Sequence, residues 1–361
     1  MSLEWIDGRY DHNELSGNKA FQEIFPGKLF RNAPLGFIDV GARGGVHSLL
    51  SPIAEITAVL GFEPDETSCK EVNDAFAAGK TPWASLKVLP VALADDAGEA
   101  TLHQCTAPTN DSLLPVNKAL SHRYKMDKFA QTGQVKVLTQ TLDSVLFGQL
   151  ASENHWGELI KLDTQGTEYE ILKGADRTLR ERAIALFVEV EFCQIYQDQK
   201  LFSELELLLR GYGFSFYGFH STHERSCKLL DKKSFLGRER LLHADAVFFK
   251  DPLPGASARP KLNERGNAVL FTCAMILGYF DFALELARVT FATGATDQKV
   301  VEKLINSFAY HDPLGAATLA HKLAEEVTAH PEYSNVAVGR FVDRYRAICN
   351  FEDVIVNLAK N

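Results

Sequence analysis

The sequence feature that most constrains this chain is the stretch 36–45, G-F-I-D-V-G-A-R-G-G. An apolar run ends in Asp39, and glycines follow at Gly41, Gly44 and Gly45. Glycine lets the backbone adopt positive φ and approach a ligand closely, so nucleotide sites place glycines after a first strand. The order predicts a buried strand, a tight turn and a helix just after it. A nucleotide site is one interpretation; a strand-turn-helix unit that binds no ligand is the other.

A second apolar run, 56–62, ends in Glu63. The interval from Gly44 to Glu63 is 19 residues, and an acidic residue about 20 residues after a glycine turn commonly holds a ribose diol. A carboxylate suits this role because it accepts two hydrogen bonds at once. We predict that Glu63 binds a ribose; the alternative is a solvated side chain at the end of a strand.

Composition restricts the classes of partner. The 361 residues are 46% hydrophobic and 24% charged, a globular balance, and this length suggests two domains. The net charge of −9 argues against a nucleic-acid partner, because such proteins need a basic face. We therefore expect no nucleic acid among the partners.

Cysteine spacing and hydropathy indicate the cellular compartment of the protein. The six cysteines lie far apart without a C-x-x-C pair, which fits a reducing cytosol better than a disulfide framework or a zinc knuckle. The first ten residues contain no apolar signal core. The longest uncharged stretch, 266–280, has 15 residues, fewer than the ~20 that a spanning helix needs. We predict a cytoplasmic protein with no membrane partner.

Strand-like and helix-like segments alternate along the first 250 residues. Strands are expected near residues 36–40, 56–62, 86–94, 99–104, 134–140, 158–163, 184–192, 214–219 and 244–249. Helices are expected near 67–78, 167–179 and 202–210. This alternation implies right-handed crossovers and a doubly wound, mostly parallel sheet. A polar loop joins the last two strands, which favours an antiparallel strand at that edge.

The pattern changes after a Pro- and Gly-rich linker at 251–260. Beyond it, apolar residues recur at helical spacing as far as residue 355, which predicts four or five short helices. We expect this all-α C-terminal extension to form a helical domain over 254–361. We expect any homo-oligomer of this protein to form through this extension.

Seven short motifs in a fixed order resemble the FkbM family of S-adenosylmethionine-dependent methyltransferases. They are D-V-G-A-R-G-G at 39–45, F-E-P at 62–64, A-L-A-D-D-A-G-E-A at 92–100, N-D-S-L-L at 110–114, T-L-D at 141–143, I-K-L-D-T-Q-G-T-E-Y-E-I-L-K-G-A at 160–175 and V-E-V at 188–190. The resemblance implies a seven-stranded, Rossmann-like methyltransferase domain over 1–253. It implies S-adenosyl-L-methionine as cofactor and a small-molecule or glycan acceptor.

The resemblance also assigns roles to residues at the strand ends. Asp39, Gly41 and Gly44 would contact the methionine part of the cofactor, and Arg43 would add a cation nearby. Glu63, followed by Pro64, would bind the ribose, while Ala92 and Leu93 would lie near the adenine. Asp163 would sit between cofactor and acceptor. The family often has D-x-E-G where this chain has D-T-Q-G, so Gln165 replaces a carboxylate by an amide.

Methyl transfer to a hydroxyl sets the requirements for catalysis. The acceptor must be held in line with the methyl group, and its oxygen is a poor nucleophile until a base removes the proton. Asp163 is the leading candidate for acceptor positioning or proton removal, with Glu168 and Glu191 behind it. The structural alternatives are a helix cap for Asp163, an exposed helical face for Glu168 and an ion pair for Glu191. No metal site is predicted.

The function that these features favour is O-methylation of a hydroxyl on a sugar, a glycan or a secondary metabolite. An NAD(P)-dependent oxidoreductase is an alternative, although the turn lacks a full G-x-G-x-x-G. A catalytically inactive, methyltransferase-like binding or scaffold protein is another, with the helical extension as its working part. An N-methyltransferase acting on nucleobases is disfavoured, because the fourth core strand ends in L-D-T-Q and not in Asn-Pro-Pro-Tyr.

Overall fold

The structure is a computed structural model that describes residues 12–153, 156–229, 238–256, 258–309, 315–339 and 341. Two compact units are distinguished by their internal contacts. The first contains residues 1–225 and 241–305, and the second contains 226–240 and 306–361.

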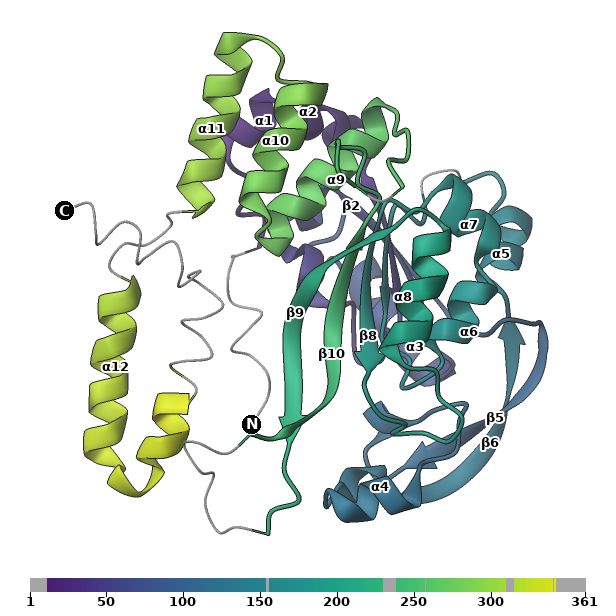
Figure 1. Cartoon of the computed structure of the whole chain (residues 1–361). Helices are drawn as coiled ribbons and strands as arrows, with labels where there is room; N and C mark the ends of the chain where they lie inside the picture. The colour runs from purple at the N-terminus through teal and green to yellow at the C-terminus, as the bar shows by residue number, and fades with distance from the viewer. Residues whose placement is uncertain are drawn as a thin grey trace. The chain divides into compact units, whose positions relative to one another are not determined.

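The first unit is built on a seven-stranded sheet with the order β3-β2-β1-β7-β8-β10-β9 (Figure 1). Its strands are β1 Leu35–Val40, β2 Thr57–Phe62, β3 Ser85–Leu89, β7 Leu159–Leu162, β8 Ala185–Glu191, β9 Ser215–Arg225 and β10 Arg240–Phe249. The five strands from β3 to β8 run parallel, whereas β10 is antiparallel to β8. The predicted doubly wound, mostly parallel sheet with an antiparallel edge is confirmed.

Every residue of β1 and β2 is buried, because helices cover both faces of the sheet centre. Consecutive side chains of a strand point to opposite faces. Ile38, Ile160 and Val188 belong to the core on one face, against helices α5 Leu142–Ser144, α6 Glu168–Lys173, α7 Asp176–Glu181 and α8 Phe202–Gly211. Asp39 and Lys161, which are register partners on β1 and β7, point to the other face.

Two expected elements are interrupted in the structure. The strand predicted over 86–94 ends with β3 at Leu89, because Pro90 offers no N–H to a sheet ladder. The chain then forms β4 Ala92–Leu93 in a second sheet of order β4-β6-β5, with β5 Gly98–Cys105 and β6 Gln131–Gln140. The helix predicted over 167–179 is split into α6 and α7 around Gly174. A Cβ there would lie 2.3 Å from the carbonyl oxygen of Ala94.

The helix expected after the glycine turn is a 3-10 helix, η2 Ser48–Ile56, and it contains Pro52. Proline inside a regular α-helix removes a backbone bond and clashes with the preceding turn. The segment also has a non-helical residue at Ile53, where the backbone kinks. Helix α3 Glu66–Ala77 follows β2 as predicted, with Asp65 accepting from the backbone N–H of Ser68 at its start.

Helices α9 Glu264–Leu277 and α10 Phe280–Thr290 follow the linker, and α11 Ala295–Ala309 begins in the same unit. Helix α9 is almost wholly buried and packs against α2 Phe25–Asn32. Arg265 of α9 forms an ion pair with Glu158 and donates to the carbonyl oxygens of Ala33 and Pro34. This arrangement attaches the start of the helical extension to the amino ends of β1 and β7.

Helix α12 Gly315–Ala329 belongs to the second unit, and the pattern predicted beyond residue 341 lies outside the described residues. The domain boundary predicted at residue 253 stays a prediction. Among the described residues, none of the helices combines the length and apolar character needed to cross a membrane.

Candidate active site

A cavity of about 270 Å³ opens at the carboxyl ends of β1, β2 and β7, the edge where parallel α/β sheets bind ligands. Its lining includes eight of the residues predicted from the sequence: Asp39, Gly41, Arg43, Glu63, Pro64, Ala92, Leu93 and Asp163. Gly44 does not line it, although its neighbour Gly45 does. Glu168 and Glu191 do not line it either.

The glycine turn brings the ends of β1 and β7 together. Gly41 has φ +87°, and a Cβ on it would lie 2.0 Å from the carbonyl oxygen of Asp163. Gly44 has φ +77° with no atom near its Cβ position, so its backbone conformation alone favours glycine. The close approach at Gly41 is what places Asp163 beside the first strand.

Glu63 lies at the end of β2, as the spacing predicted. Its side chain is largely buried, and Oε1 accepts from the backbone N–H of Asp65 at 2.9 Å. Burial raises the pKa of this carboxyl group, although the Asp65 N–H and the Arg43 guanidinium oppose the shift. No described residue donates a hydrogen bond to Oε2, and this oxygen can accept from a ligand at the cavity wall.

Lys161 is a buried cation that the sequence reasoning missed. Only 4% of its side chain is exposed, and Nζ lies 3.2 Å from Asp39 Oδ1 and 3.8 Å from Asp163 Oδ2. Burial alone would lower the pKa of Lys161, but these two carboxylates raise it above the usual range. The sequence did contain an indication of this residue, because a lysine lies inside the apolar strand L-I-K-L and lysine is almost never fully buried without a partner.

Asp39 is fully buried and binds the backbone of the segment that follows the glycine turn. Its Oδ2 accepts from the backbone N–H of His47 at 2.7 Å, while Oδ1 faces Lys161. Both oxygens are therefore occupied by the protein. The geometry supports a role in fixing the turn and the lysine at the cavity wall.

Asp163 follows β7 and has 42% of its side chain exposed. Its Oδ1 accepts from Nε2 of Gln165 at 2.9 Å, and Oδ2 faces Lys161. Burial would raise the pKa of Asp163, but the Lys161 ammonium and the Gln165 amide outweigh it and lower the pKa. An ionised carboxylate is thus presented to the cavity at neutral pH.

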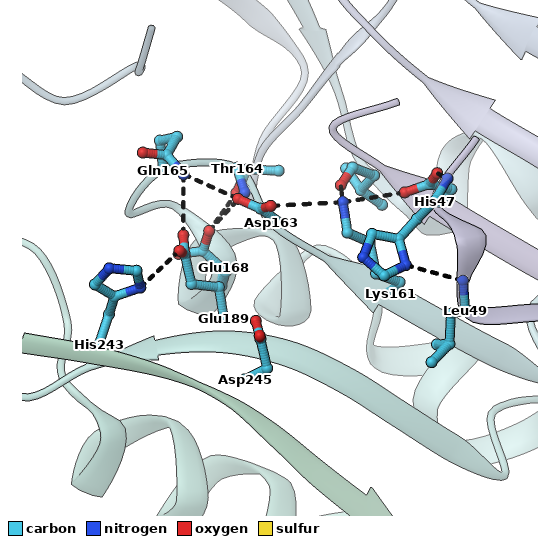
Figure 2. Close-up of polar contacts among 12 residues, drawn as sticks. His47, Leu49, Lys161, Asp163, Thr164, Gln165, Glu168, Glu189, His243 and Asp245 are labelled. Carbon is cyan, nitrogen blue, oxygen red and sulfur yellow. Dashed lines mark hydrogen bonds and ion pairs between the residues drawn. The ribbon is translucent and has the colours of Figure 1, made fainter. Parts of the chain in front are cut away.

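Beside Asp163 lies a polar group on β8, β9 and β10, which we call the Glu189 cluster: Glu189, Ser221, His223, His243 and Asp245. Figure 2 shows Glu189 between Gln165 and His243. Glu189 Oε1 lies 3.0 Å from His243 Nδ1. The rings of His223 and His243 stack at 4.3 Å, and Ser221 donates to Asp245.

Burial shifts the pKa values of the titratable side chains in the Glu189 cluster. It raises the pKa of Glu189 well above its usual range, and the neighbouring Asp163 carboxylate adds to this shift. Burial also raises the pKa of Asp245 and lowers that of His243 to about 4. Among the described residues, no three His, Cys, Asp or Glu side chains are arranged to hold a metal ion.

Glu168 and Glu191 are buried away from the cavity. The Glu168 carboxylate accepts from the backbone N–H groups of Thr164 and Gly166 and from the Thr164 hydroxyl. It therefore organises the turn between β7 and α6. Glu191 is 3% exposed at the end of β8. The catalytic roles predicted for both stay predictions, and neither carboxylate reaches the cavity in this geometry.

The segment 108–114 closes one side of the cavity. Arg43 donates to the carbonyl oxygen of Pro108 and to Asp111 Oδ2, both at 2.9 Å. The Ser112 hydroxyl donates to the backbone carbonyl of Gln165 at 2.7 Å. These bonds explain why the N-D-S-L-L motif accompanies the glycine turn, since they fasten it to two strand ends.

The oxidoreductase alternative would draw on the spacing Tyr196-x-x-x-Lys200, but the two side chains bind other partners. Tyr196 is buried, and its hydroxyl contacts the Asn110 carbonyl and Gln165 Oε1. Lys200 pairs with Glu204 one helical turn further along, at 2.8 Å. The two residues do not form a common site.

A glycine turn, a carboxylate after the second strand and a cavity between them are the features that doubly wound α/β proteins use to bind nucleotides. Residues 39–216 match the family model of the methyltransferase FkbM domain. The chain therefore carries a methyltransferase domain of the FkbM family, which implies use of S-adenosylmethionine. The predicted family and fold class are confirmed.

A solved structure is also similar to this chain, namely the crystal structure of methyltransferase FkbM from Methylobacillus flagellatus KT. The identity is 13% and the TM-score 0.34, over 60% of this chain and 43% of that chain. This chain thus matches less than half of the length of that protein. The comparison with curated proteins finds no match.

Proposed function

We propose that this protein transfers a methyl group from S-adenosylmethionine to a hydroxyl of a sugar, a glycan or a secondary metabolite. The observation that carries the proposal is the cavity that joins Glu63 to Asp163 within the methyltransferase FkbM domain. One end of this cavity offers a ribose-binding carboxylate, and the other offers an ionised carboxylate next to open space.

The residues present fit the cofactor. When bound, S-adenosylmethionine supplies a methyl group activated by a positively charged sulfur. Glu63 would hold the ribose diol through its available oxygen, and the apolar side chains of Ala92, Leu93 and Leu102 would contact the adenine. The Asp163 carboxylate would offset the positive charge. The glycine turn, whose Gly44 and Gly45 have open space at their Cβ positions, allows backbone contact with the ligand.

Asp163 would position the acceptor and take its proton. The acceptor hydroxyl would pass its proton to an Asp163 oxygen as its own oxygen takes up the methyl group that S-adenosylmethionine would supply. Lys161 and Gln165 hold the carboxylate in place from two sides. In-line positioning is the main requirement, and proton removal by a placed base typically adds about 10²–10⁴-fold in rate.

The proposal is tested with Asp163→Asn and labelled S-adenosylmethionine against a panel of sugars, glycosides and phenolic metabolites. We expect wild-type protein to label at least one hydroxyl acceptor. Asp163→Asn should lose about 10²-fold or more of the rate while its affinity for S-adenosylhomocysteine, which is neutral at sulfur, stays within a few-fold. Asp74→Asn, an exposed carboxylate on α3, is the matched control. Undiminished transfer by Asp163→Asn would refute the assigned role; binding of NADH in place of S-adenosylhomocysteine would refute the function.

A further inference from the structure

Gln165, which lines the cavity, is held through both its backbone and its side chain. Its backbone has φ +61°, an uncommon conformation for a residue other than glycine, and Ser112 donates to its carbonyl oxygen. The side-chain Oε1 accepts from the Tyr196 hydroxyl at 3.0 Å. Nε2 donates to Asp163 Oδ1 at 2.9 Å and to Glu189 Oε2 at 3.0 Å. All these partners come from different segments of the chain.

The two carboxylates fix which way the amide points. An amide nitrogen carries two hydrogens, and each has one carboxylate oxygen to bond. If the amide were reversed, Oε1 would face both carboxylates without a proton between them, which is unfavourable. Tyr196 supports the observed direction because its hydroxyl offers a donor to Oε1. Gln165 thus links Asp163 and Glu189 by donating one hydrogen bond to each carboxylate.

The two carboxylates that Gln165 links also have different titratable neighbours. Asp163 has the Lys161 ammonium on its other side, whereas Glu189 has the His243 imidazole at 3.0 Å. Because Glu189 Oε2 accepts from Gln165, a proton shared with His243 must lie on the Oε1 side. The other titratable groups that act on this pair are Asp163 after β7, Glu168 on α6, Glu191 on β8, His223 and Arg225 on β9, and Asp245 on β10.

We propose that Gln165 is a positioning residue that keeps Asp163 ionised toward the cofactor cavity and leaves the proton of the paired carboxylates with Glu189 and His243. The assignment rests on the proposed function, since it concerns the charge presented to the cofactor sulfur. Two carboxylates close together without such a donor share one proton, and neither is reliably ionised. The amide removes that competition.

The test needs no acceptor, because S-adenosylmethionine and S-adenosylhomocysteine differ by one positive charge that does not titrate. The ratio of their dissociation constants, measured by calorimetry, therefore reports the charge of the cavity. It is measured from about pH 5.5 to 8 for wild type, Gln165→Met, the double variant Asp163→Asn/Gln165→Met, and Gln197→Met as an exposed control. Within each variant, the neutral ligand is the internal reference for folding.

We expect the preference of wild type and Gln197→Met for the charged ligand to be nearly constant, since the pKa of Asp163 is lowered and the group stays ionised throughout. In Gln165→Met the preference should fall roughly tenfold toward the acid end, because a carboxylate near the cavity now becomes protonated. Adding Asp163→Asn should make the ratio constant again, which identifies Asp163 as the titrating group.

Two results would overturn this assignment alone: a constant ratio in Gln165→Met, or a pH dependence that survives Asp163→Asn. Failure of wild type to bind either ligand would overturn the proposed function and the assignment together. The two failures are therefore distinguishable in the same experiment.

Discussion

Replacing Lys161 by methionine is the perturbation that most directly probes how the site is held. The substitution keeps most of the length of the side chain and removes its charge. In the native protein Nζ lies 3.2 Å from Asp39 Oδ1, 3.8 Å from Asp163 Oδ2 and 3.4 Å from the carbonyl oxygen of Val40. Asp39 is fully buried, and among the described residues its Oδ1 has the Lys161 ammonium as ion-pair partner and no other donor.

The magnitude follows from this geometry. Lys161→Met leaves the Asp39 carboxylate buried without a compensating cation, and breaking a buried pair in this way costs about 3–5 kcal/mol. A domain of this size loses roughly 2 °C of melting temperature per kcal/mol. We therefore expect the melting temperature of the first unit to fall by about 6–10 °C. The pKa of Asp163 should rise as well, because the ammonium is the largest influence that lowers it.

The assay is thermal unfolding followed by the fluorescence of Trp83 and Trp156, both buried in the first unit. The matched variant is Asp39→Asn/Lys161→Met, which removes both charges. We expect it to recover a substantial part of the lost stability, because the remaining cost is that of an imperfectly paired amide and not of a buried charge. Asp39→Asn alone should also be destabilised, since it leaves Lys161 without its nearest partner.

The reasoning would be refuted by a Lys161→Met variant that melts within about 2 °C of wild type, or by a double variant no more stable than the single one. Either result would mean that the ion pair of Asp39 and Lys161 contributes little to the free energy of unfolding. Pairs of charges that are exposed to water behave in that way, and this pair is not exposed.

Two further substitutions have outcomes fixed by local geometry. Gly41→Ala should abolish binding of S-adenosylhomocysteine in calorimetry, because its Cβ would overlap the carbonyl oxygen of Asp163. Gly44→Ala should reduce the binding free energy by only the ~1–2 kcal/mol of an unfavourable backbone conformation. Equal losses of affinity in the two variants would contradict this prediction. Arg265→Ala should lower the melting temperature of the first unit with ligand affinity unchanged, since it leaves Glu158 without its ion-pair partner at the amino ends of the strands; altered affinity would contradict it.

Much of the fold could be predicted because the parallel strands are buried on both faces and appear as apolar runs. The strand before Asp39 and the one before Glu63 are examples, and both residues lie where the spacing placed them. The turn glycines were informative because positive φ and close backbone approach restrict what can replace them. The interruption by Pro90 was also present in the sequence, since proline does not donate to a sheet ladder.

The polar network could not be predicted, because its members are brought together only by the register of the sheet. Gln165 was seen as a departure from the family pattern, but its partners Ser112, Glu189 and Tyr196 come from separate segments. His243 reaches Glu189 through the antiparallel pairing of β10 with β8. The spacing of these residues along the chain does not predict such contacts.

The measurement that tests the central claim most directly is calorimetric titration of the full chain with S-adenosylhomocysteine and, separately, with NADH. The account predicts one S-adenosylhomocysteine bound per chain and no NADH binding. Glu63→Gln should weaken the affinity by roughly tenfold to a hundredfold, the loss expected for a charge-assisted hydrogen bond to the ribose. Absence of S-adenosylhomocysteine binding, or an affinity that Glu63→Gln leaves unchanged, would contradict the account.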